Sequence, residues 1–510
     1  VFVFFFFSSF YRISYISISS SFDTSSGIIT INKNIRGNIY DRNGILLASS
    51  INSKSLSARP LLINDIDLLS IQLEQILNID KKIIKKKLLN NKKFVWLKRN
   101  ITPLEHQKVI DLGEIHLEFY NETKRIYPFK NFTSHLVGFV DIDEKGQRGI
   151  ERFYNKSLTN SDDVFLSIDV NLQQAVRKNL IDTIHHYHAE SGLAVVMDIS
   201  NGEVLASVSF PDFNPNNNED FNKFNLVNRV VQSNYEMGST FKPLTVVNGY
   251  DYGIIEPDMI IDVKKSVKGV KDHNAFKENG LYSIEKVVVE SSNIGTAQIA
   301  LKIGKSNQKD FLKKLGFFEK LDIELFEAEK PLANPHNWGL HETARISFGH
   351  SFSITPLHLV KAYASIANEG NIVHPTFVIK NEVRPAKNIL FKKDTSEYFL
   401  SLLEAVITKT KFTGPRVKIN GYQIGGKTGT SELLNPKGGY YKDRNRTSFI
   451  GVFPVNNPRY VVYTSIDYPK KPEDSSKRMT GAVVNAPLVK NIIFEIIKIF
   501  NLPSYDIDKI

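Results

Sequence analysis

The clearest amphipathic pattern in the chain lies between residues 169 and 187. Its apolar side chains recur every three or four positions, which is the spacing of one face of an α-helix. They are Leu172, Val176, Leu180, Ile184 and Tyr187. Asp169 directly precedes them, and an aspartate there can accept hydrogen bonds from the first free N–H groups of a helix. The pattern predicts a helix that begins after Asp169.

Short apolar runs separated by turn residues predict two β-hairpins in the second half of the chain. The first joins residues 192–198 (GLAVVMD) to residues 203–209 (EVLASVS) through an Asn-Gly pair. The second joins residues 446–455 to residues 459–467. A closing helix is predicted from about Pro487 to Phe500. A helix before a sheet, further strands, and a closing helix predict an α+β fold built in layers, with a cluster of helices inserted between the strands.

The first 160 residues have a different pattern. Residues 35–50 predict a hairpin whose turn is Asp41-Arg42-Asn43-Gly44, with the Asn-Gly pair supplying positive φ angles. We interpret Asp41 and Arg42 as residues of turn and ion-pair geometry within this region. Residues 60–120 have helical spacing, at Ile71, Leu73, Ile76 and Leu77.

The chain starts with an apolar stretch, VFVFFFFSSFY at residues 1–11. This stretch is shorter than the roughly 20 residues that a membrane-spanning helix needs, and its first residue is Val, not Met. We interpret residues 1–20 as the tail of a membrane anchor or signal sequence whose upstream part is missing. The alternative is a β-rich start that belongs to the fold.

Composition bounds the function. With 510 residues, 42% of them hydrophobic and 23% charged, the chain is globular and long enough for two or three domains. The net charge of +11 fits either attraction to an anionic membrane or lipid-linked substrate, or a general richness in Lys, Asn and Ile. We favour the second interpretation, and no nucleic acid is implied. The absence of cysteine excludes disulfides and thiolate chemistry.

Candidate chemistry begins at Ser239 and Lys242, three residues apart at the start of a predicted helix. Gly238 allows a sharp turn there, and Pro243 fits only within about the first four residues of a helix. Three residues along a helix return to the same face, so Lys242 can reach the Ser239 hydroxyl. A lysine can deprotonate a serine if burial or a nearby cation destabilises its ammonium.

Two later segments add to this pair. Ser291-Ser292-Asn293 supplies a hydroxyl and a carboxamide, and Lys427-Thr428-Gly429-Thr430 supplies a second cation, two hydroxyls and a glycine. The order S-x-x-K, S-x-N, K-T-G is the signature of the penicillin-binding protein and serine β-lactamase superfamily. One such motif alone is weak, whereas the joint match is highly specific.

The chain resembles a class B penicillin-binding protein, the D,D-transpeptidase that cross-links peptidoglycan, and most closely the division-type (septal) member. The likeness covers nearly all of residues 36–490. It is carried by RGNIYDRNG at 36–44, HLVGFVD at 135–141, GIERFYN at 149–155, NRVVQSNYEMGSTFKP at 228–243, SSNIGTAQIA at 291–300, SFGHSFSITPLHLVKAYASIAN at 347–368 and GKTGTS at 426–431.

The resemblance implies a domain order and a fold. Residues 1–20 would be the residual anchor, and residues 21–160 a mixed pedestal (dimerisation-like) domain without activity of its own. Residues 161–502 would form the transpeptidase domain, an antiparallel sheet flanked by helices with a helical subdomain, and residues 503–510 a tail.

Carried over position by position, the resemblance also implies catalytic roles. Ser239 would be the acylated nucleophile and Lys242 its base. Ser291 would relay a proton towards the leaving amine. Asn293 would hold the substrate carbonyl and help to position Lys242. Lys427 would keep the site electropositive, which disfavours the Lys242 ammonium and attracts the terminal carboxylate of the substrate.

Substrate binding is implied for the remaining motif residues. Thr428 and Thr430 would hydrogen-bond that carboxylate, and Gly429 would leave room for substrate against the strand. The backbone N–H groups of Ser239 and Thr430 would form the oxyanion hole. No metal or organic cofactor is required, and His185, His186 and His188, which end a predicted helix without a ligand set, do not predict a metal site.

The resemblance further implies ligands, partners and location. The ligands would be D-alanyl-D-alanine stem peptides and β-lactams. The partners would be cell-division membrane proteins, including a lipid II polymerase of the shape/division family. The protein would sit in the inner (cytoplasmic) membrane through a single-pass anchor, with the catalytic domain in the periplasm or extracytoplasmic space.

This chain departs from the family pattern at two positions, where Met237 replaces a frequent proline and Ser351 a frequent glycine. Glu236, beside the first of them, is interpreted as structural.

Four other functions stay as alternatives. A serine β-lactamase needs an E-x-x-L-N segment, and residues 329–334 carry one residue too many. A non-catalytic β-lactam sensor would retain the same pocket. An elongation-type transpeptidase would share every motif, although the Ser-Ser-Asn-Ile-Gly run resembles the division type better. A bifunctional glycosyltransferase would need more than the roughly 160 residues before the second domain.

Overall fold

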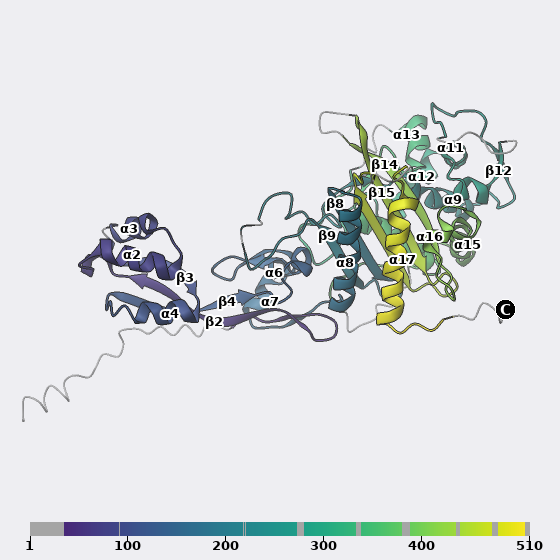
Figure 1. Ribbon diagram of the computed structural model, residues 1–510. Helices are drawn as coiled ribbons and strands as arrows, with labels where there is room; N and C mark the ends of the chain where they lie inside the picture. Colours follow the sequence, from purple (N-terminus) through teal and green to yellow (C-terminus); the bar gives the residue numbers. More distant parts are fainter. Residues whose placement is uncertain are drawn as a thin grey trace, which may run out of the picture.

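The computed structural model describes residues 35–504, except 91, 218, 220, 273–279, 333–337, 380–387, 435–438 and 472–477. The chain forms a small head, joined by a long two-stranded ribbon to a larger body (Figure 1). The predicted anchor, residues 1–20, and residues 505–510 of the predicted tail lie outside the described residues. Within the described ranges, every helix is too short or too polar to cross a membrane.

The head is built on three strands and three helices. They are β2 (Leu46–Ala58), β3 (Val95–Ile101), β4 (Leu117–Ile126), α2 (Ile66–Leu77), α3 (Lys81–Leu88) and α4 (Pro103–Ile110). Strand β2 pairs antiparallel with β4 from Ser49 opposite Ile126 to Ala58 opposite Leu117. Its far end also pairs with β3. The β2–β4 pair is the ribbon that reaches the body (Figure 1).

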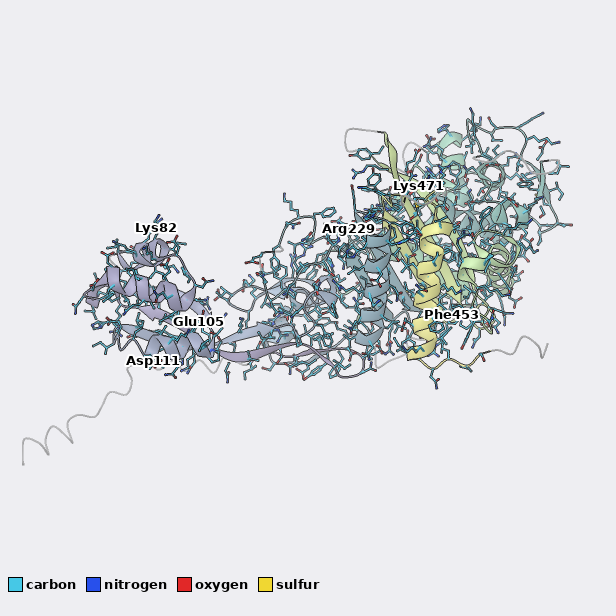
Figure 2. The ribbon with its side chains drawn as sticks, in the orientation of Figure 1. Lys82, Glu105, Asp111, Arg229, Phe453 and Lys471 are labelled. Carbon is cyan, nitrogen blue, oxygen red and sulfur yellow. The ribbon has the colours of Figure 1, made fainter. Side chains whose placement is uncertain are left out.

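The head encloses its own apolar core. Its buried side chains come from all three helices and all three strands, among them Leu56, Leu69, Leu73, Leu77, Ile84, Leu88, Leu97, Ile101, Val109 and Leu117. The predicted helical pattern is confirmed, but Ile71 is 43% exposed because the inward stripe of α2 is Leu69, Leu73 and Leu77. Lys82, Glu105 and Asp111 lie on the head (Figure 2).

Caps fix the ends of the head helices. Asp65 accepts a hydrogen bond from Leu68 N at the start of α2. At the start of α4, Thr102 and Glu105 form a reciprocal capping box, in which each side chain bonds the backbone N–H of the other. These local contacts define the helices without help from the body.

The segment between ribbon and body, which we call the root, comprises residues 35–45 and 127–165. Its elements are β1 (Ile39–Tyr40), η2 (Lys130–Phe132), α5 (Ser134–Val137), β5 (Phe139–Val140), β6 (Gly146–Arg148), α6 (Gly149–Phe153), α7 (Asn155–Thr159) and β7 (Val164–Phe165). Ile39, Ile150 and Leu158 of the root belong to one buried cluster with Leu244 and Val461 of the body. The root therefore packs as part of the body, whereas the head does not.

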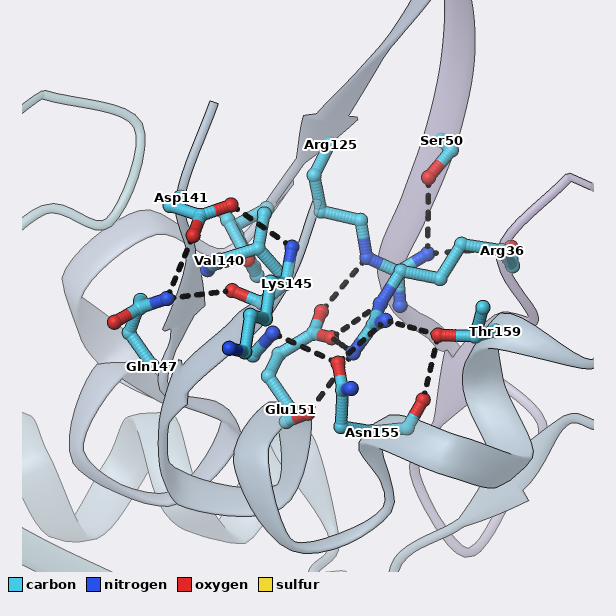
Figure 3. Close-up of polar contacts among 12 residues, drawn as sticks. Arg36, Ser50, Arg125, Val140, Asp141, Lys145, Gln147, Glu151, Asn155 and Thr159 are labelled. Carbon is cyan, nitrogen blue, oxygen red and sulfur yellow. Dashed lines mark hydrogen bonds and ion pairs between the residues drawn. The ribbon is translucent and has the colours of Figure 1, made fainter. Parts of the chain in front are cut away.

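A buried charge cluster fastens the root (Figure 3). The Glu151 carboxylate accepts hydrogen bonds from Arg36 Nε at 2.8 Å and from Arg125 Nε at 2.7 Å. Arg36 also donates to Asn155 Oδ1 at 3.0 Å. Since Arg125 ends β4 and Glu151 lies on α6, the cluster ties the ribbon to the root. Such buried groups are stable only while the charges are matched.

The predicted hairpin at residues 35–50 is confirmed, with Ile39 opposite Ala48 and Asp41 accepting hydrogen bonds from Asn43 N and Ile45 N. Only Gly44 of the turn has a positive φ, 78°. The predicted ion-pair role of Arg42 is confirmed, although its partner, Glu203 at 3.2 Å, lies in the body and not in the pedestal.

The body contains a five-stranded antiparallel sheet in the order β14-β15-β16-β8-β9. These strands are β8 (Ser191–Asp198), β9 (Val204–Phe210), β14 (Gly425–Leu434), β15 (Tyr440–Phe453) and β16 (Tyr460–Asp467). Both predicted hairpins are confirmed, since Val196 lies opposite Ala206 and Ile450 opposite Tyr463. The predicted α+β class is confirmed.

Side-chain alternation along β8 separates two layers of helices. Ala194 and Val196 pack in the cluster that includes α8 (Val170–His186) and α17 (Gly481–Ile499), which cover one face of the sheet (Figure 1). Val195 packs in the cluster that includes α14 (Pro356–Ala367). The other body helices are η4 (Gly238–Phe241), α9 (Lys242–Asp251), α10 (Ile284–Val289), α11 (Asn293–Ile303), α12 (Lys305–Lys314), α13 (Leu340–Ile346), α15 (Lys393–Lys409) and α16 (Gly414–Val417).

The cap predicted for α8 is confirmed, because the Asp169 side chain accepts from Asn171 N and Leu172 N. The predicted start of α17 near Pro487 is wrong. The helix begins at Gly481 and contains Pro487 in its interior. A proline there leaves the carbonyl four residues earlier without its helical donor. That carbonyl, Val483 O, accepts a hydrogen bond from Tyr187 OH of α8 at 3.2 Å instead.

Candidate active site

Ser239 lies on a tight turn of 3-10 helix, η4, that runs directly into α9. Gly238 adopts a φ of 56°, which a side chain would disfavour, and Pro243 stands in the first turn of α9. Gly238 N donates to Gly349 O at 3.1 Å. The predicted position of Ser239 at a helix start is confirmed.

Three buried contacts hold this turn. Tyr363 OH of α14 donates to Thr240 O at 2.6 Å, and Thr240 Oγ1 donates to Met237 O at 2.7 Å. The loop at Gly349 packs so closely that a Cβ on this residue would lie 2.4 Å from Gly238 O. The turn that carries Ser239 is therefore fixed by packing and hydrogen bonds within the protein itself.

At Ser351, where the family often has glycine, the serine takes a left-handed backbone conformation. Ser351 has a φ of 59°, a conformation that favours glycine. Its N–H donates to Glu236 Oε1 at 2.7 Å, and its Oγ accepts from Arg345 Nε at 2.9 Å. These two bonds hold the strained residue, and the structural interpretation of Glu236 is confirmed.

Two lysine amines converge on the hydroxyl of Ser291. Lys242 Nζ donates to Ser291 Oγ at 3.0 Å and also to the Ser291 carbonyl. Lys427 Nζ donates to the same Oγ at 3.1 Å and to Thr428 O at 3.3 Å. All three predicted motifs therefore meet in space, with the Ser291 hydroxyl between the two amines.

Burial changes the acidity of both lysines, each only 1% exposed. Burial lowers the pKa of Lys242 well below its usual value, the charge of Lys427 lowers it further, and Asp272 opposes the shift. Burial lowers the pKa of Lys427 to about 8. The lowered pKa of Lys242 favours its neutral form more than in an exposed lysine, while a pKa of about 8 leaves Lys427 mostly charged at pH 7.

Ser291 owes its orientation to a left-handed turn between α10 and α11. Its φ is 58°, and its N–H donates to Val288 O at 3.2 Å. The next residue, Ser292, caps α11 by accepting from Gly295 N at 2.9 Å. A non-glycine residue in this conformation is strained, and such residues concentrate at functional sites.

Asp272 is a site residue that the sequence did not indicate. Its carboxylate accepts from Ser292 Oγ at 2.7 Å, from Asn293 N at 2.5 Å and from Ile294 N at 3.0 Å. It thus holds the start of α11 while partly offsetting the positive charge near Lys242. It stands 20 residues before Ser292, in a segment without periodic pattern, so no local signal marks it.

Asn293 lies at the first position of α11, on the cleft wall. Its side-chain amide donates to Lys271 O at 3.1 Å. Within the described part of the chain, the hydrogen bonds of the Lys242 amine go to Ser291. Within the described residues, the Asn293 amide thus bonds the loop at Lys271, and the hydrogen bond to Lys242 that its expected positioning role would use is not among the contacts of that amine.

The third motif lies on the edge strand β14, with Gly429 opposite Ser448 of β15. A Cβ at Gly429 would lie 2.4 Å from Ser448 Oγ and 3.2 Å from Met237 O. The neighbouring strand β15, and less tightly the turn that carries Ser239, thus leave little room for a side chain here. Thr430 Oγ1 accepts from Gly481 N at 3.4 Å, which ties the strand to the start of α17.

One cleft of about 440 Å³ collects these groups. Lys242 and Lys427 are buried beside it, while the other candidate residues line it. Those residues are Ser239, Ser291, Asn293, Thr428, Gly429 and Thr430. Asp272, Tyr282, Glu290 and His350 complete much of the wall. The arrangement suits attack by a serine on an acyl group that carries an anion.

The fold, together with two buried lysines that share one serine hydroxyl, is typical of serine enzymes that transfer acyl groups. The model of the penicillin binding protein transpeptidase domain matches residues 192–493, and that of the penicillin-binding protein dimerisation domain matches residues 31–164. The chain belongs to the penicillin-binding protein transpeptidase family. The division-type resemblance stated from the motifs is consistent with both matches and with the relatives below.

Several bacterial proteins are similar along most of their length. A probable peptidoglycan D,D-transpeptidase FtsI of Caulobacter vibrioides is 30% identical over 476 residues, covering 90% of this chain and 80% of its own. Peptidoglycan D,D-transpeptidase FtsI of Escherichia coli is 28% identical over 506 residues, covering 92% and 84%. A peptidoglycan synthetase structure from Bifidobacterium adolescentis, 21% identical, superposes with a TM-score of 0.72 over 93% of this chain and 97% of its own, which supports the fold.

Proposed function

We propose that this protein is a peptidoglycan D,D-transpeptidase that forms peptide cross-links through a serine acyl-enzyme, in septal wall synthesis during cell division. The observation that carries the proposal is the Ser291 hydroxyl held between two buried lysine amines, beside the cleft that Ser239 lines. The names of the similar FtsI proteins support the substrate and the septal role.

In the first step, Ser239 Oγ attacks the carbonyl between the two terminal D-alanines of a stem peptide. Its proton passes to the neutral Lys242 amine, whose low pKa makes this transfer feasible. The C–N bond breaks, an ester forms on Ser239, and the proton reaches the leaving D-alanine amine through the Ser291 hydroxyl.

In the second step, an amine from a neighbouring stem peptide attacks the ester. The new amide forms as the C–O bond to Ser239 breaks, and the amine's proton returns to Ser239 Oγ by the same relay. No metal or organic cofactor enters either step.

Binding groups stand around this reaction. Charged Lys427, Thr428 and Thr430 would hold the terminal carboxylate, because charge-assisted hydrogen bonds are strong in a dry site. Backbone N–H groups of Ser239 and Thr430 would bind the developing oxyanion, a contribution typically worth about 3 kcal/mol of barrier. Asn293, which lines the cleft, would hold the carbonyl of the substrate peptide.

The setting of the enzyme follows from the same proposal. Residues 1–20 would continue an anchor in the inner membrane, with the pedestal of residues 21–160 and the transpeptidase domain of residues 161–502 on the extracytoplasmic side. Cell-division membrane proteins, including a lipid II polymerase of the shape/division family, would be its partners. β-Lactams would acylate Ser239.

Covalent labelling tests the proposal directly. A fluorescent penicillin should label the wild-type protein, and Ser239→Ala should lower labelling by at least about 1,000-fold because no other nucleophile replaces the hydroxyl. Ser401→Ala on α15 serves as the control, since Ser401 is exposed and does not line the cleft. Labelling that persists in a folded Ser239→Ala protein contradicts the proposal.

The division role has its own test. Depletion of the protein should produce filamentous cells with a septal location of the tagged protein. Round cells would assign it to elongation instead. Labelling by penicillin without cross-linking of D-alanyl-D-alanine peptides would indicate a non-catalytic sensor.

A further inference from the structure

A second, smaller cleft of about 190 Å³ adjoins the active-site cleft. Asn293 and His350 line both clefts, so a ligand that lies beside Ser239 can extend past them into the smaller one. The ionisable side chains of the smaller cleft are all basic. They are Lys268, Lys271, His341, Arg345 and His350. We call this smaller cleft the cationic recess.

A tight turn places Lys268 in the recess. Val267 and Val270 form an isolated β-bridge, so Lys268 and Gly269 are the two central residues of the turn between them. Their φ angles are 50° and 76°, as in a type I′ turn. Lysine adopts positive φ infrequently. The bridge therefore keeps this lysine in a defined place despite local strain.

The carboxylates near the recess accept hydrogen bonds from backbone N–H groups, and one of them, Glu342, also pairs with His341 of the recess. Asp272 accepts from the backbone at the start of α11, Glu236 accepts from Ser351 N, and Glu342 accepts from Gly339 N while lying 3.8 Å from His341.

Among the residues that the structure describes, Lys268, Lys271 and Arg345 form no ion pair. The recess thus presents positive charge to whatever enters it.

We propose that the cationic recess binds a carboxylate in the interior of the peptide substrate, distinct from the terminal carboxylate assigned to Lys427 and Thr430. This inference rests on the proposed function. Lysine and arginine side chains bind carboxylates through charge-assisted hydrogen bonds. Because the recess opens beside Asn293, an acidic residue upstream of the reacting carbonyl would reach it. The recess therefore selects stem peptides that keep this carboxylate free.

A pair of peptides tests the recess. Both end in D-alanyl-D-alanine, and they differ only in whether one internal glutamyl carboxylate is free or amidated. Each competes with a fluorescent penicillin for the full chain, and the measured quantity is the ratio of their inhibition constants. The variant is Lys268→Gln with Lys271→Gln. Both side chains are exposed, and the contact of Asn293 uses the backbone carbonyl of Lys271, which the substitution keeps.

The matched control is Lys265→Gln, an exposed lysine on the same segment that does not line the recess. We expect wild type and control to prefer the free carboxylate by about threefold to tenfold, as exposed ion pairs of moderate strength would give. The double variant should lose most of this preference. Added salt should reduce the wild-type preference, which checks the electrostatic origin without any substitution.

Two results overturn the inference while leaving the proposed function intact. One is penicillin labelling at Ser239 together with equal inhibition of the wild type by the two peptides. The other is a preference that persists in the double variant. Absence of labelling in the wild type would instead refute the proposed function, and the recess proposal with it.

Discussion

The head and the body bury different kinds of groups. The core of the head is apolar, and its ion pairs, such as Lys98 with Glu105, are partly exposed. The body buries two lysine amines without a carboxylate bonded to either one. Burying such charges opposes folding, and the gain is a pair of amines with lowered pKa values. The body, and not the head, thus contains buried groups that lower stability and serve the proposed reaction.

The two regions also differ in how they are joined to the rest of the chain. The head has its own core and reaches the body through the β2–β4 ribbon. The root shares the core of the body. A destabilising substitution in the root should therefore also affect the active site, whereas one in the head should destabilise only the head.

The largest expected effect comes from Glu151→Gln in the root. The change leaves Arg36 and Arg125 buried without their carboxylate charge, which should lower the free energy of unfolding by about 3–5 kcal/mol. Calorimetry of the whole chain should show the transition of the body at lower temperature. Asp182→Asn, in an exposed pair with Lys178, is the control. A shift no larger than the control's would contradict shared packing of root and body.

A smaller effect is expected from Leu73→Ala in the head. Leu73 is fully buried, so its truncation should destabilise the head by about 3 kcal/mol. The rate of penicillin labelling should stay that of the wild type, because the core of the head is separate. Ile71→Ala, 43% exposed on the same helix, should change little. If the labelling rate falls when Leu73→Ala destabilises the head, the two regions are not independent.

The smallest expected effect on stability comes from Lys427→Met in the body. Unlike the other two substitutions, it should increase the stability of the protein. Folding lowers the pKa of Lys427 from 10.5 to about 8, so between these pH values the folded state binds fewer protons than the unfolded state. Wild-type stability should therefore rise from pH 8 to pH 10.5. The fall in pKa corresponds to about 3 kcal/mol, and loss of the hydrogen bonds to Ser291 and Thr428 offsets about 1 kcal/mol of it. Removing the charge should therefore stabilise the body at pH 7 by about 2 kcal/mol.

The measurement for Lys427→Met is chemical denaturation across that pH range, alongside penicillin labelling. The variant should show a smaller rise in stability with pH, the remainder coming from Lys242, and should lose most of the labelling. Lys302→Met, at an exposed position of α11, should keep both. An unchanged pH dependence in Lys427→Met would show that this amine does not titrate as its burial implies.

Much of the fold follows from local patterns. The stripe and cap of α8, the two body hairpins and the turn before Gly44 are each encoded within about 20 consecutive residues, where periodicity and turn chemistry act directly. The resemblance carried by the three motifs likewise predicted that Ser239, both lysines and Ser291 belong to one site. Whether these residues act as proposed remains a prediction for the labelling experiments.

Other features could not be predicted because they depend on distant segments. Pro487 lies inside α17 since Tyr187 of α8 satisfies the carbonyl that the proline leaves free. Asp272 belongs to the site because the chain folds back onto the start of α11. The space at Gly429 is limited by Ser448 of the paired strand and by the remote turn at Met237.

The sequence by itself determined the helices and strands, the order of the domains and the chemical groups available for acyl transfer. Tertiary structure alone decided which amines are buried, which hydroxyl they share and which surfaces adjoin the cleft. The physical reason is the distance along the chain over which each interaction acts. Helical periodicity and turns act over a few residues, whereas burial and the pKa shifts it causes arise only when segments far apart in the chain exclude water together.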